Sequence, residues 1–347
     1  GVDSVVMTHI LWILSREMGF ALEAAHLNHM LRGEQAQEDQ QFSRVFCTER
    51  GIPFHTKEVD VAAVARKEKL SCEDAGRQIR YRYFEEIMCG WENAKLALAH
   101  NKNDQAETVL LHIIRGSGIE GLKGMVAFRE KKVRPLLFAT RKEIEAYAAD
   151  NSLQYRMDKT NQETVYTRNR VRLSLLPMLE KEFNPSVVEQ LCSLAQYAKE
   201  DGEFLNAQAQ TLYQQYVKSD KYALRAPVET VKKWSPSLRK RIWNQMYQTL
   251  SGTSLESAHL EGLERLFTKK TGAEISLPKG YIGKVRYEWI SIEKKQKKIP
   301  EFSYELPENG LIYISEIHTT VQECAADIKN EGIFLPKGHK CVIRNRR

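Results

Sequence analysis

The stretch ALAHNKNDQAETVLLHIIRGSG, residues 97–118, predicts the fold class because it holds a strand, a polar turn and a helix in immediate succession. The run Leu96–Ala99 is short and wholly apolar, which is typical of a strand buried on both faces. NKND follows His100 and is turn-prone, and QAETVLLHIIR predicts a helix that ends near Gly116. Open α/β sheets bind ligands at such a turn, at the carboxyl end of a strand.

The helix in this stretch carries two carboxylates near its start, Asp104 and Glu107. Residues three and four apart are neighbours on a helix, so both lie on a stripe that continues through Thr108 and Leu111 to Arg115. One interpretation is a capping box, with Asp104 as the cap and Glu107 three residues on, which needs no ligand. The other is a pair of carboxylates that faces a ligand. The stretch alone leaves both open.

The composition narrows the class of protein. A chain of 347 residues, 42% hydrophobic and 28% charged, predicts about two or three domains. No run approaches the roughly 20 apolar residues of a membrane span, and no secretory signal is visible, so we expect no membrane partner. The net charge of +7 permits an anionic partner such as nucleic acid.

The cysteines point to a reducing compartment. They form no C-x-x-C pair, which argues against a cysteine-bound zinc or iron–sulfur site and predicts free thiols in the cytoplasm. The six positions are Cys47, Cys72, Cys89, Cys192, Cys324 and Cys341.

Outward from the opening stretch, strand and helix patterns alternate to about residue 185. This alternation predicts a parallel sheet covered on both faces by helices. The expected strands lie in FALEAAHLNH (20–29), PFHTKEVDV (53–61) and KVRPLL (132–137). The expected helices cover Ser4–Met18, Gln37–Arg50, Cys72–Cys89 and Arg141–Asp150.

The remaining chain predicts two further domains. Residues 187–270 have helical patterns, AEISLPKGYIGKVRYEWISI (273–292) is strand-like, and the basic EKKQKKIP (293–300) is a plausible linker. We expect an α/β domain over 1–186, a mainly helical domain over 187–300, and the start of a small β-rich C-terminal domain over 301–347.

Both ends of the sequence read as cut. GVDSVVMTHILWILSREMG opens on a helix start with no strand before it, and CVIRNRR stops inside a strand-like run. We expect the first central strand to be missing, and the chain to be inactive and to melt below a form with that strand restored.

Two short motifs near the start could bind a nucleotide. GVDS (1–4) places a glycine, an acid and a hydroxyl at a helix N-terminus, which is either an anion site or an ordinary N-cap. HLNHMLRG (26–33) follows a strand, and its two histidines have neither the spacing nor the third ligand of a zinc site.

Two other segments are rich in arginine. SCEDAGRQIRYRYFEEI (71–87) puts Arg77 and Arg80 on one helix face, where they bind phosphate or form a solvated stripe paired with Glu73 or Asp74. DKTNQETVYTRNRVRLSLLPMLE (158–180) carries Arg168, Arg170 and Arg172 near a helix start, with Tyr166 beside them. This pattern indicates contact with phosphates or a nucleotide, or a charged helix end packed on the sheet.

Together, and in this order, the motifs resemble the tRNA(Ile)-lysidine synthetase family of the PP-loop ATP pyrophosphatases. The family's phosphate motif is S-G-G-x-D-S, of which this chain keeps GVDS. The resemblance is close over roughly residues 1–185 and looser beyond. Its further matches are HLNHMLRGEQAQEDQ, SCEDAGRQIRYRYF, AHNKNDQAETVLLHIIRGSGIEGLKGM, RPLLFATRKEIEAY and DKTNQETVYTRNRVRLSLLP. The chain departs from the family at Asn101, where a second histidine is usual, and at Asn103, where an acid is frequent.

The resemblance implies a ligase that joins free lysine to C2 of the wobble cytidine of an isoleucine tRNA with a CAU anticodon. ATP and Mg²⁺ are the implied cofactors. An adenylated cytidine is the intermediate, AMP and pyrophosphate are released, and decoding switches from AUG to AUA. It also implies a cytoplasmic protein and a possible homodimer.

The resemblance also assigns roles to residues of this chain. Asp3, Arg80, Asp104 and Glu107 are expected to be catalytic; Asp104 and Glu107 bind and activate lysine, and Asp3 assists through Mg²⁺ or the amine. The expected ATP-binding residues are Gly1, Val2, Asp3, Ser4, His26, Asn28, Arg80 and His100. Arg115, Arg168 and Arg172 are expected at the cytidine or its phosphates. The basic residues expected to hold the tRNA body are Lys232, Lys233, Arg239, Lys240 and Arg241.

Two rival functions remain. A PP-loop enzyme of the 2-thiocytidine type is expected to carry cysteines near its site, typically as C-x-x-C, which this sequence lacks. A non-enzymatic tRNA-binding relative is favoured where the carboxylates or arginines are missing, yet they are present.

Overall fold

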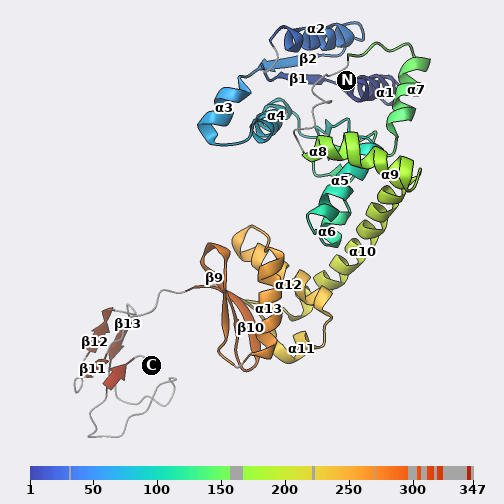
Figure 1. Ribbon diagram of the computed structural model, residues 1–347. Coiled ribbons are helices and arrows are strands. Elements are labelled where there is room, and N and C mark those ends of the chain that lie inside the picture. Colours follow the sequence, from blue (N-terminus) through green and yellow to red (C-terminus); the bar gives the residue numbers. More distant parts are fainter. Residues whose placement is uncertain are drawn as a thin grey trace. The chain divides into compact units, whose positions relative to one another are not determined.

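The computed structural model describes residues 1–30, 33–156, 167–220, 223–269, 271–295, 303–305, 311–315, 319–322 and 342–344. The chain divides into two compact units, Gly1–Leu205 and Asn206–Arg347 (Figure 1). Within the described part of the chain, no helix combines the length and apolarity that crossing a membrane requires.

The first unit begins with a helix and a parallel pair of strands. Its first elements are α1 (Val2–Met18), β1 (Ala24–Asn28), α2 (Glu34–Thr48), β2 (Phe54–Glu58), α3 (Val61–Glu68) and α4 (Cys72–Met88). β1 and β2 pair in parallel, with Ala24 opposite Phe54, and α2 covers one face of the pair (Figure 1). These elements confirm the expected helices and strands; α3 lies in a stretch for which we expected no helix.

A second small sheet follows. β3 (Leu96–Ala97) pairs in parallel with β5 (Lys132–Val133), and β4 (Phe128–Arg129) joins β5 antiparallel. The parallel arrangement expected of the domain is therefore present. Among the described strands, its two parallel pairs belong to separate sheets.

Helices of the first unit surround these sheets. They are α5 (Lys102–Ile114), α6 (Ile119–Leu122), α7 (Arg141–Asp150), α8 (Thr167–Arg170), the π-helical turn η2 (Val171–Leu175), α9 (Leu176–Glu182) and the first part of α10 (Val187–Tyr216). One apolar core joins Val2, Val5 and Val6 of α1 to Ile144 of α7. A second core packs α5 against η2 and α9 through Val109, Val171 and Leu176.

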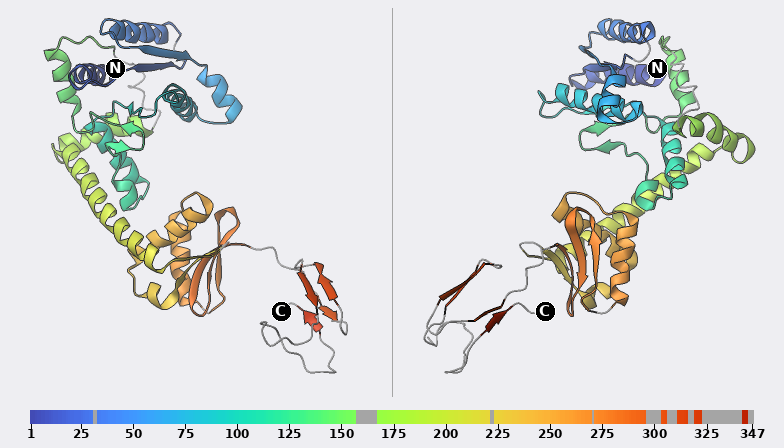
Figure 2. Two further views of the ribbon diagram at one scale, coloured as in Figure 1. Left: turned by 180° about the vertical axis from the view of Figure 1, so that it is seen from behind. Right: turned by 60° about the vertical axis from the view of Figure 1, so that its left-hand side comes forward.

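The second unit is built on an antiparallel sheet with the strand order β6-β7-β10-β9-β8. Its strands are β6 (Lys218–Asp220), β7 (Ala223–Pro227), β8 (Glu274–Leu277), β9 (Tyr281–Val285) and β10 (Trp289–Lys294). The helices α11 (Val228–Lys232), α12 (Pro236–Ser251) and α13 (Ser257–Arg265) accompany it (Figure 2). Trp243 and Tyr247 of α12 are fully buried in its core.

The strands β8 to β10 were expected, and β6 and β7 were not, because KSDKYALRAP is short and mostly polar. The domain boundaries at 186 and 300 stay predictions. Part of the expected linker, residues 296–300, and most of 301–347 lie outside the described residues. The strands described there are β11 (Ser303–Glu305), β12 (Leu311–Ile314), β13 (Thr319–Gln322) and β14 (Val342–Arg344).

Candidate functional site

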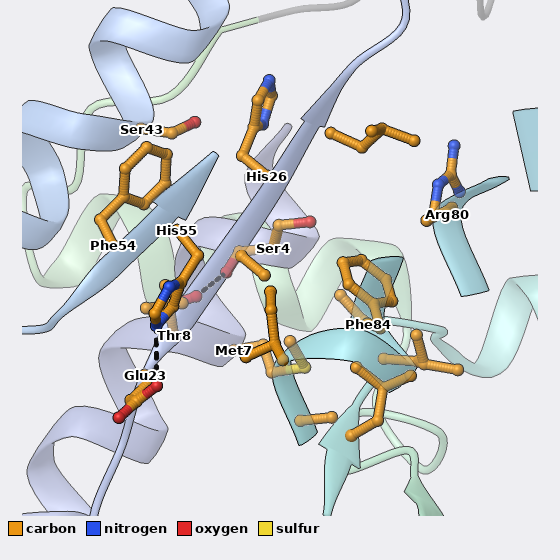
Figure 3. Close-up of a pocket in the computed structure, with 18 of the residues that line it drawn as sticks. Ser4, Met7, Thr8, Glu23, His26, Ser43, Phe54, His55, Arg80 and Phe84 are labelled. Carbon is orange, nitrogen blue, oxygen red and sulfur yellow. Dashed lines mark hydrogen bonds and ion pairs between the residues drawn. The ribbon is translucent and has the colours of Figure 1, made fainter. Parts of the chain in front are cut away.

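A cavity of about 1450 Å³ runs along β1 and β3 in the first unit. Figure 3 shows Ser4, Met7 and Thr8 of α1 on its wall, with His26 of β1 and Arg80 of α4 farther along. The side chains of α4 and β1 therefore meet α1 around one space large enough for a nucleotide.

Six of the eight residues expected to bind ATP line this cavity: Gly1, Ser4, His26, Asn28, Arg80 and His100. Val2 is 1% exposed and its side chain belongs to the apolar core, so only its backbone is available to a ligand. Asp3 points to another group of residues, described below.

His26 is the middle residue of β1, and Asn28 is its last residue. Burial lowers the pKa of His26, so its imidazole is neutral at pH 7, and its ring lies 6.3 Å from that of Phe54. Asn28 is buried, and its Oδ1 accepts a hydrogen bond of 3.0 Å from the backbone N–H of Met30. The Asn28 side chain thus holds the turn after β1.

Arg80 is positioned by a residue of that turn. Its Nη2 lies 3.1 Å from Nε2 of His29, and burial lowers its pKa. Gly76 on the same helix makes the approach possible, because a Cβ there would lie 3.0 Å from Cε1 of His29. Sequence reasoning placed His29 in a motif that contacts the nucleotide or supports such contacts, but it did not pair His29 with Arg80.

His100 follows β3 and lines the cavity. Burial lowers its pKa to about 4; Asp104 opposes this shift, and Arg134, Arg168 and Arg77 reinforce it. Its buried Nδ1 has no hydrogen-bond partner among the described residues. His100 is therefore a neutral imidazole whose Nδ1 is available for a hydrogen bond, and it lies within the electrostatic influence of Arg134, Arg168 and Arg77.

Asp3 and Asp104 are joined through Asn101. The Asn101 Nδ2 donates to Asp3 Oδ1 over 2.9 Å, and the Asn101 backbone N–H donates to Asp104 Oδ2 over 3.0 Å. Asn101 Oδ1 in turn accepts from the backbone N–H of Asp104, which completes a capping box at the start of α5. The capping box therefore differs from the one considered as an alternative in the sequence: Asn101 is the cap, Asp104 is the third helical residue, and Glu107 takes no part.

Glu107 is held by two arginines instead. It is 1% exposed, and Arg172 donates from Nε to Oε1 over 2.5 Å and from Nη2 to Oε2 over 3.0 Å. Arg168 Nε donates to Oε2 over 3.2 Å. Arg172 Nη2 also reaches Oδ1 of Asp104 at 2.5 Å, so one guanidinium links both carboxylates.

Arg141 completes this network and was missed by sequence reasoning. Its Nη1 donates to Asp3 Oδ2 over 2.7 Å, and its backbone N–H donates to Oδ1 of Asn103 over 3.0 Å. Asn103 thereby places the start of α7 beside Asp3. The only sequence signal was the position of Arg141 within RPLLFATRKEIEAY, which marks no partner.

Arg115 is not brought to the site. It follows the last residue of α5, is exposed, and lies eight residues, or about 12 Å of helix rise, beyond Glu107. Tyr166 and the residues 158–165 of the same arginine-rich motif lie outside the described residues, as do Leu31 and Arg32.

Arg239 cannot serve as an exposed contact to tRNA, contrary to expectation. Its side chain is 15% exposed and its Nη2 lies 2.5 Å from Glu264 Oε2, while Nη1 donates to the Trp234 carbonyl. Lys232 and Lys233 are exposed, as expected of residues that meet a phosphate backbone.

Asp3 is the residue that was expected to bind Mg²⁺ together with ATP. No group of three or more histidine, cysteine or acidic side chains placed to hold a metal occurs among the residues that the structure describes. Mg²⁺ at nucleotide sites is bound by one or two carboxylates and the substrate phosphates, so a single carboxylate has the right chemistry. In this structure both oxygens of Asp3 accept hydrogen bonds, from Asn101 and from Arg141, and a bound ion would have to replace one of these.

The comparisons with known proteins agree with this geometry. Residues 1–179 match the family model of the PP-loop domain. The tRNA(Ile)-lysidine synthase of Caldanaerobacter subterraneus subsp. tengcongensis is 36% identical over 300 residues, covering 86% of this chain and 64% of the relative. That of Clostridium acetobutylicum is 34% identical over 345 residues, covering 96% and 74%. The chain thus spans less than two thirds of the length of the first of these relatives.

One solved structure overlaps part of the fold. The U34-tRNA thiolase NcsA from Methanococcus maripaludis, with its [4Fe-4S] cluster, matches at 20% identity with a TM-score of 0.46, covering 57% of this chain and 70% of that one.

Proposed function

The chain belongs to the tRNA(Ile)-lysidine synthase family of PP-loop proteins, and from this we propose that it ligates free lysine to C2 of the wobble cytidine of tRNA(Ile), using ATP. The observation that carries the proposal is the cluster of three carboxylates around the start of α5. Asp3, Asp104 and Glu107 lie within one hydrogen-bonded network, and His100, just before α5, lines the cavity.

The first step is adenylation of the cytidine. C2 of cytosine is part of a urea-like carbonyl and is a poor electrophile. Transfer of AMP to its oxygen, with pyrophosphate as the leaving group, creates a good leaving group at C2. Arg80 would stabilise charge at the α-phosphate, and neutral His100 would donate or accept a hydrogen bond there. The backbone N–H groups at the start of α1 would hold pyrophosphate.

The second step is attack by lysine. Its ε-amine displaces AMP from C2, and one proton of the ammonium group must first be removed. Asp104 and Glu107 would hold the ammonium group, and one of them would accept the proton. Asp3 would hold Mg²⁺ through the ATP phosphates, where the ion neutralises phosphate charge.

The tRNA would be held by several basic residues. Arg168 lines the cavity and, with Arg172, would steady the cytidine or its phosphate. Lys232, Lys233, Lys240 and Arg241 would contact the tRNA body. The contribution of Arg115 and the homodimer stay predictions, as does a cytoplasmic location.

The test is mass spectrometry of the tRNA. An isoleucine tRNA with a CAU anticodon is incubated with the protein, ATP, Mg²⁺ and isotopically labelled lysine, and the wobble nucleoside is isolated. We expect labelled lysine in that nucleoside. Sulfur incorporation would support the 2-thiocytidine alternative, and tight tRNA binding without any modification would support the non-enzymatic one.

A further inference from the structure

The carboxylate pair of the proposed lysine site is already matched by two cations. Glu107 is 1% and Asp104 8% exposed, and both accept hydrogen bonds from Arg172. Arg168 lies 3.2 Å from Glu107 and 3.6 Å from Asp104. Two negative charges thus face two positive charges.

This balance restricts how a lysine side chain can bind. A buried carboxylate needs a cation, and a third cation placed beside a neutral cluster lacks a partner and is desolvated at a net cost. Arg172 and Arg168 already supply three hydrogen bonds to the Glu107 carboxylate, which has about four acceptor sites in all. Lysine therefore needs at least one guanidinium to leave.

We propose that Arg172 and Arg168 hold the place of the substrate's ammonium group, and that lysine binds by exchange with them. This inference rests on the proposed function, in that Asp104 and Glu107 are taken as the lysine site. Until lysine arrives, the two arginines hydrogen-bond the two buried carboxylates and hold them in position. Once displaced, they are free to meet the phosphates of the other substrates.

The surroundings of the arginines permit such an exchange. Their side chains are 34% and 35% exposed, so neither is enclosed by the protein. Val171, between them, is 4% exposed and fixes the backbone in the core that α5 shares with α9. The side chains can therefore swing while the helix stays in place. Arg168 already lines the cavity, so a short swing brings it toward a bound nucleotide.

The exchange makes a prediction opposite to that of a fixed ion pair. If the pair is fixed and lysine binds beside it, loss of Arg172 loosens the carboxylates and weakens lysine binding. If Arg172 competes with lysine, its loss vacates the carboxylates and strengthens lysine binding, because the binding-competent state is no longer a minor one.

The experiment is a calorimetric titration with L-lysine in the absence of ATP and tRNA. The variants are Arg172→Gln, Arg168→Gln and the matched control Arg170→Gln, which removes the same charge from an exposed position of the same helix. We expect Arg172→Gln to lower the Kd for lysine by about fivefold or more, Arg168→Gln to lower it less, and Arg170→Gln to leave it within about twofold. An unchanged or raised Kd in Arg172→Gln, at wild-type melting temperature, overturns the exchange.

A measurement on the wild-type protein covers the case in which Arg172→Gln folds poorly. The Nε–H of Arg172 is hydrogen-bonded to Glu107, so its resonance in ¹⁵N-arginine-labelled protein is identified by its loss in that variant or in Glu107→Gln. Addition of L-lysine should move or broaden this resonance and leave that of Arg170 in place. A resonance that stays unchanged at saturating lysine contradicts the exchange but leaves the proposed function standing. Absence of lysine binding in all variants contradicts the lysine site itself.

Discussion

Burial distinguishes Glu107 from an ordinary glutamate on a helix surface. An exposed glutamate on a helix would be solvated by water, whereas this one is 1% exposed and its carboxylate accepts hydrogen bonds from Arg172 and Arg168. Its spacing from Asp104 was visible in the sequence, and so was the presence of arginines near residue 170. Their pairing was not, because the two segments are about sixty residues apart and nothing local links them.

The substitution Glu107→Gln should separate chemistry from structure. The amide keeps the size of the side chain but neither takes up a proton nor balances an ammonium group, so we expect lysine transfer to fall by about a hundredfold and adenylation to fall less. Single-turnover assays of lysine incorporation and pyrophosphate release give the two rates. Glu189→Gln, at an exposed carboxylate 3.9 Å from Lys102, is the control and should change neither. Equal loss of both rates in Glu107→Gln would mean that the carboxylate only supports the fold.

His100 should make stability depend on pH. Its pKa of about 4 in the folded protein lies below its ordinary value of 6.5, chiefly because of burial. Between these values the unfolded chain takes up a proton and the folded chain does not, so the free energy of unfolding falls as pH falls from 6.5 to 4. At pH 5 the loss should be about 1–2 kcal/mol. Urea unfolding of wild type and His100→Gln at pH 7 and pH 5 measures it; a slope that is the same in both proteins would contradict this role.

At the scale of elements, local sequence signals predicted the bounds of helices well, whereas the cap of α5 and the pairing of distant strands were not predicted. α7 covers Arg141–Asp150 as expected, because its capping residue and apolar spacing lie within a few residues. The cap of α5 was placed at Asp104 rather than Asn101, since NKND offers several residues that can cap a helix. β6 and β7 were missed because KSDKYALRAP is short and mostly polar, and because β10, which pairs with β7, comes more than sixty residues later.

Asn101 both caps α5 and binds Asp3, and a comparison with a residue that only caps a helix can separate the two roles. Asn101→Ala removes the side chain that caps the helix and also the link to Asp3, so it should lower stability by about 1 kcal/mol and reduce adenylation. Asp60→Ala is the matched control, because Asp60 caps α3 through the N–H of Ala63 and α3 does not line the cavity. Thermal melting should fall in both variants, and tRNA-dependent pyrophosphate release in Asn101→Ala alone. Similar release in the two variants would reduce Asn101 to a cap.

At the scale of the whole molecule, the two units offer different chemistry. The cavity and the carboxylate network lie wholly within Gly1–Leu205. The second unit carries basic residues of two kinds, exposed lysines and the buried Arg239, which sequence reasoning grouped together. Charge is visible in a sequence, but burial depends on which residues of the folded unit surround it.

The first unit predicts the products of ATP cleavage. In the proposed reaction pyrophosphate is the leaving group, so the bond broken would be the one between the α- and β-phosphates. We expect the tRNA-dependent products to be AMP and pyrophosphate, with no ADP. Chromatography of α-labelled ATP after reaction with tRNA measures them. Formation of ADP in proportion to tRNA would end the proposed mechanism.

In the second unit we expect different effects when the ion-paired Arg239 and the exposed Lys233 are substituted: the first should change stability and the second tRNA binding. Arg239→Gln removes the ion-pair partner of Glu264, whose side chain is 15% exposed and keeps a hydrogen bond from Trp243, so it should lower the stability of that unit by about 1–3 kcal/mol. Lys233→Gln should leave stability unchanged and weaken tRNA binding modestly, with a smaller salt dependence. Urea unfolding and tRNA binding at two salt concentrations test both. Loss of tRNA affinity in a stably folded Arg239→Gln would return Arg239 to the binding surface.

The π-helical turn at Val171–Leu175 makes the length of this segment a constraint in its own right. An α-helix rotates by about 100° for each residue. Deleting one residue from the turn would leave Leu176 seated in the core and carry Arg168 about a quarter of the way around the helix, away from Glu107. The number of residues in this segment, and not only their types, therefore maintains the charge pairing with Glu107.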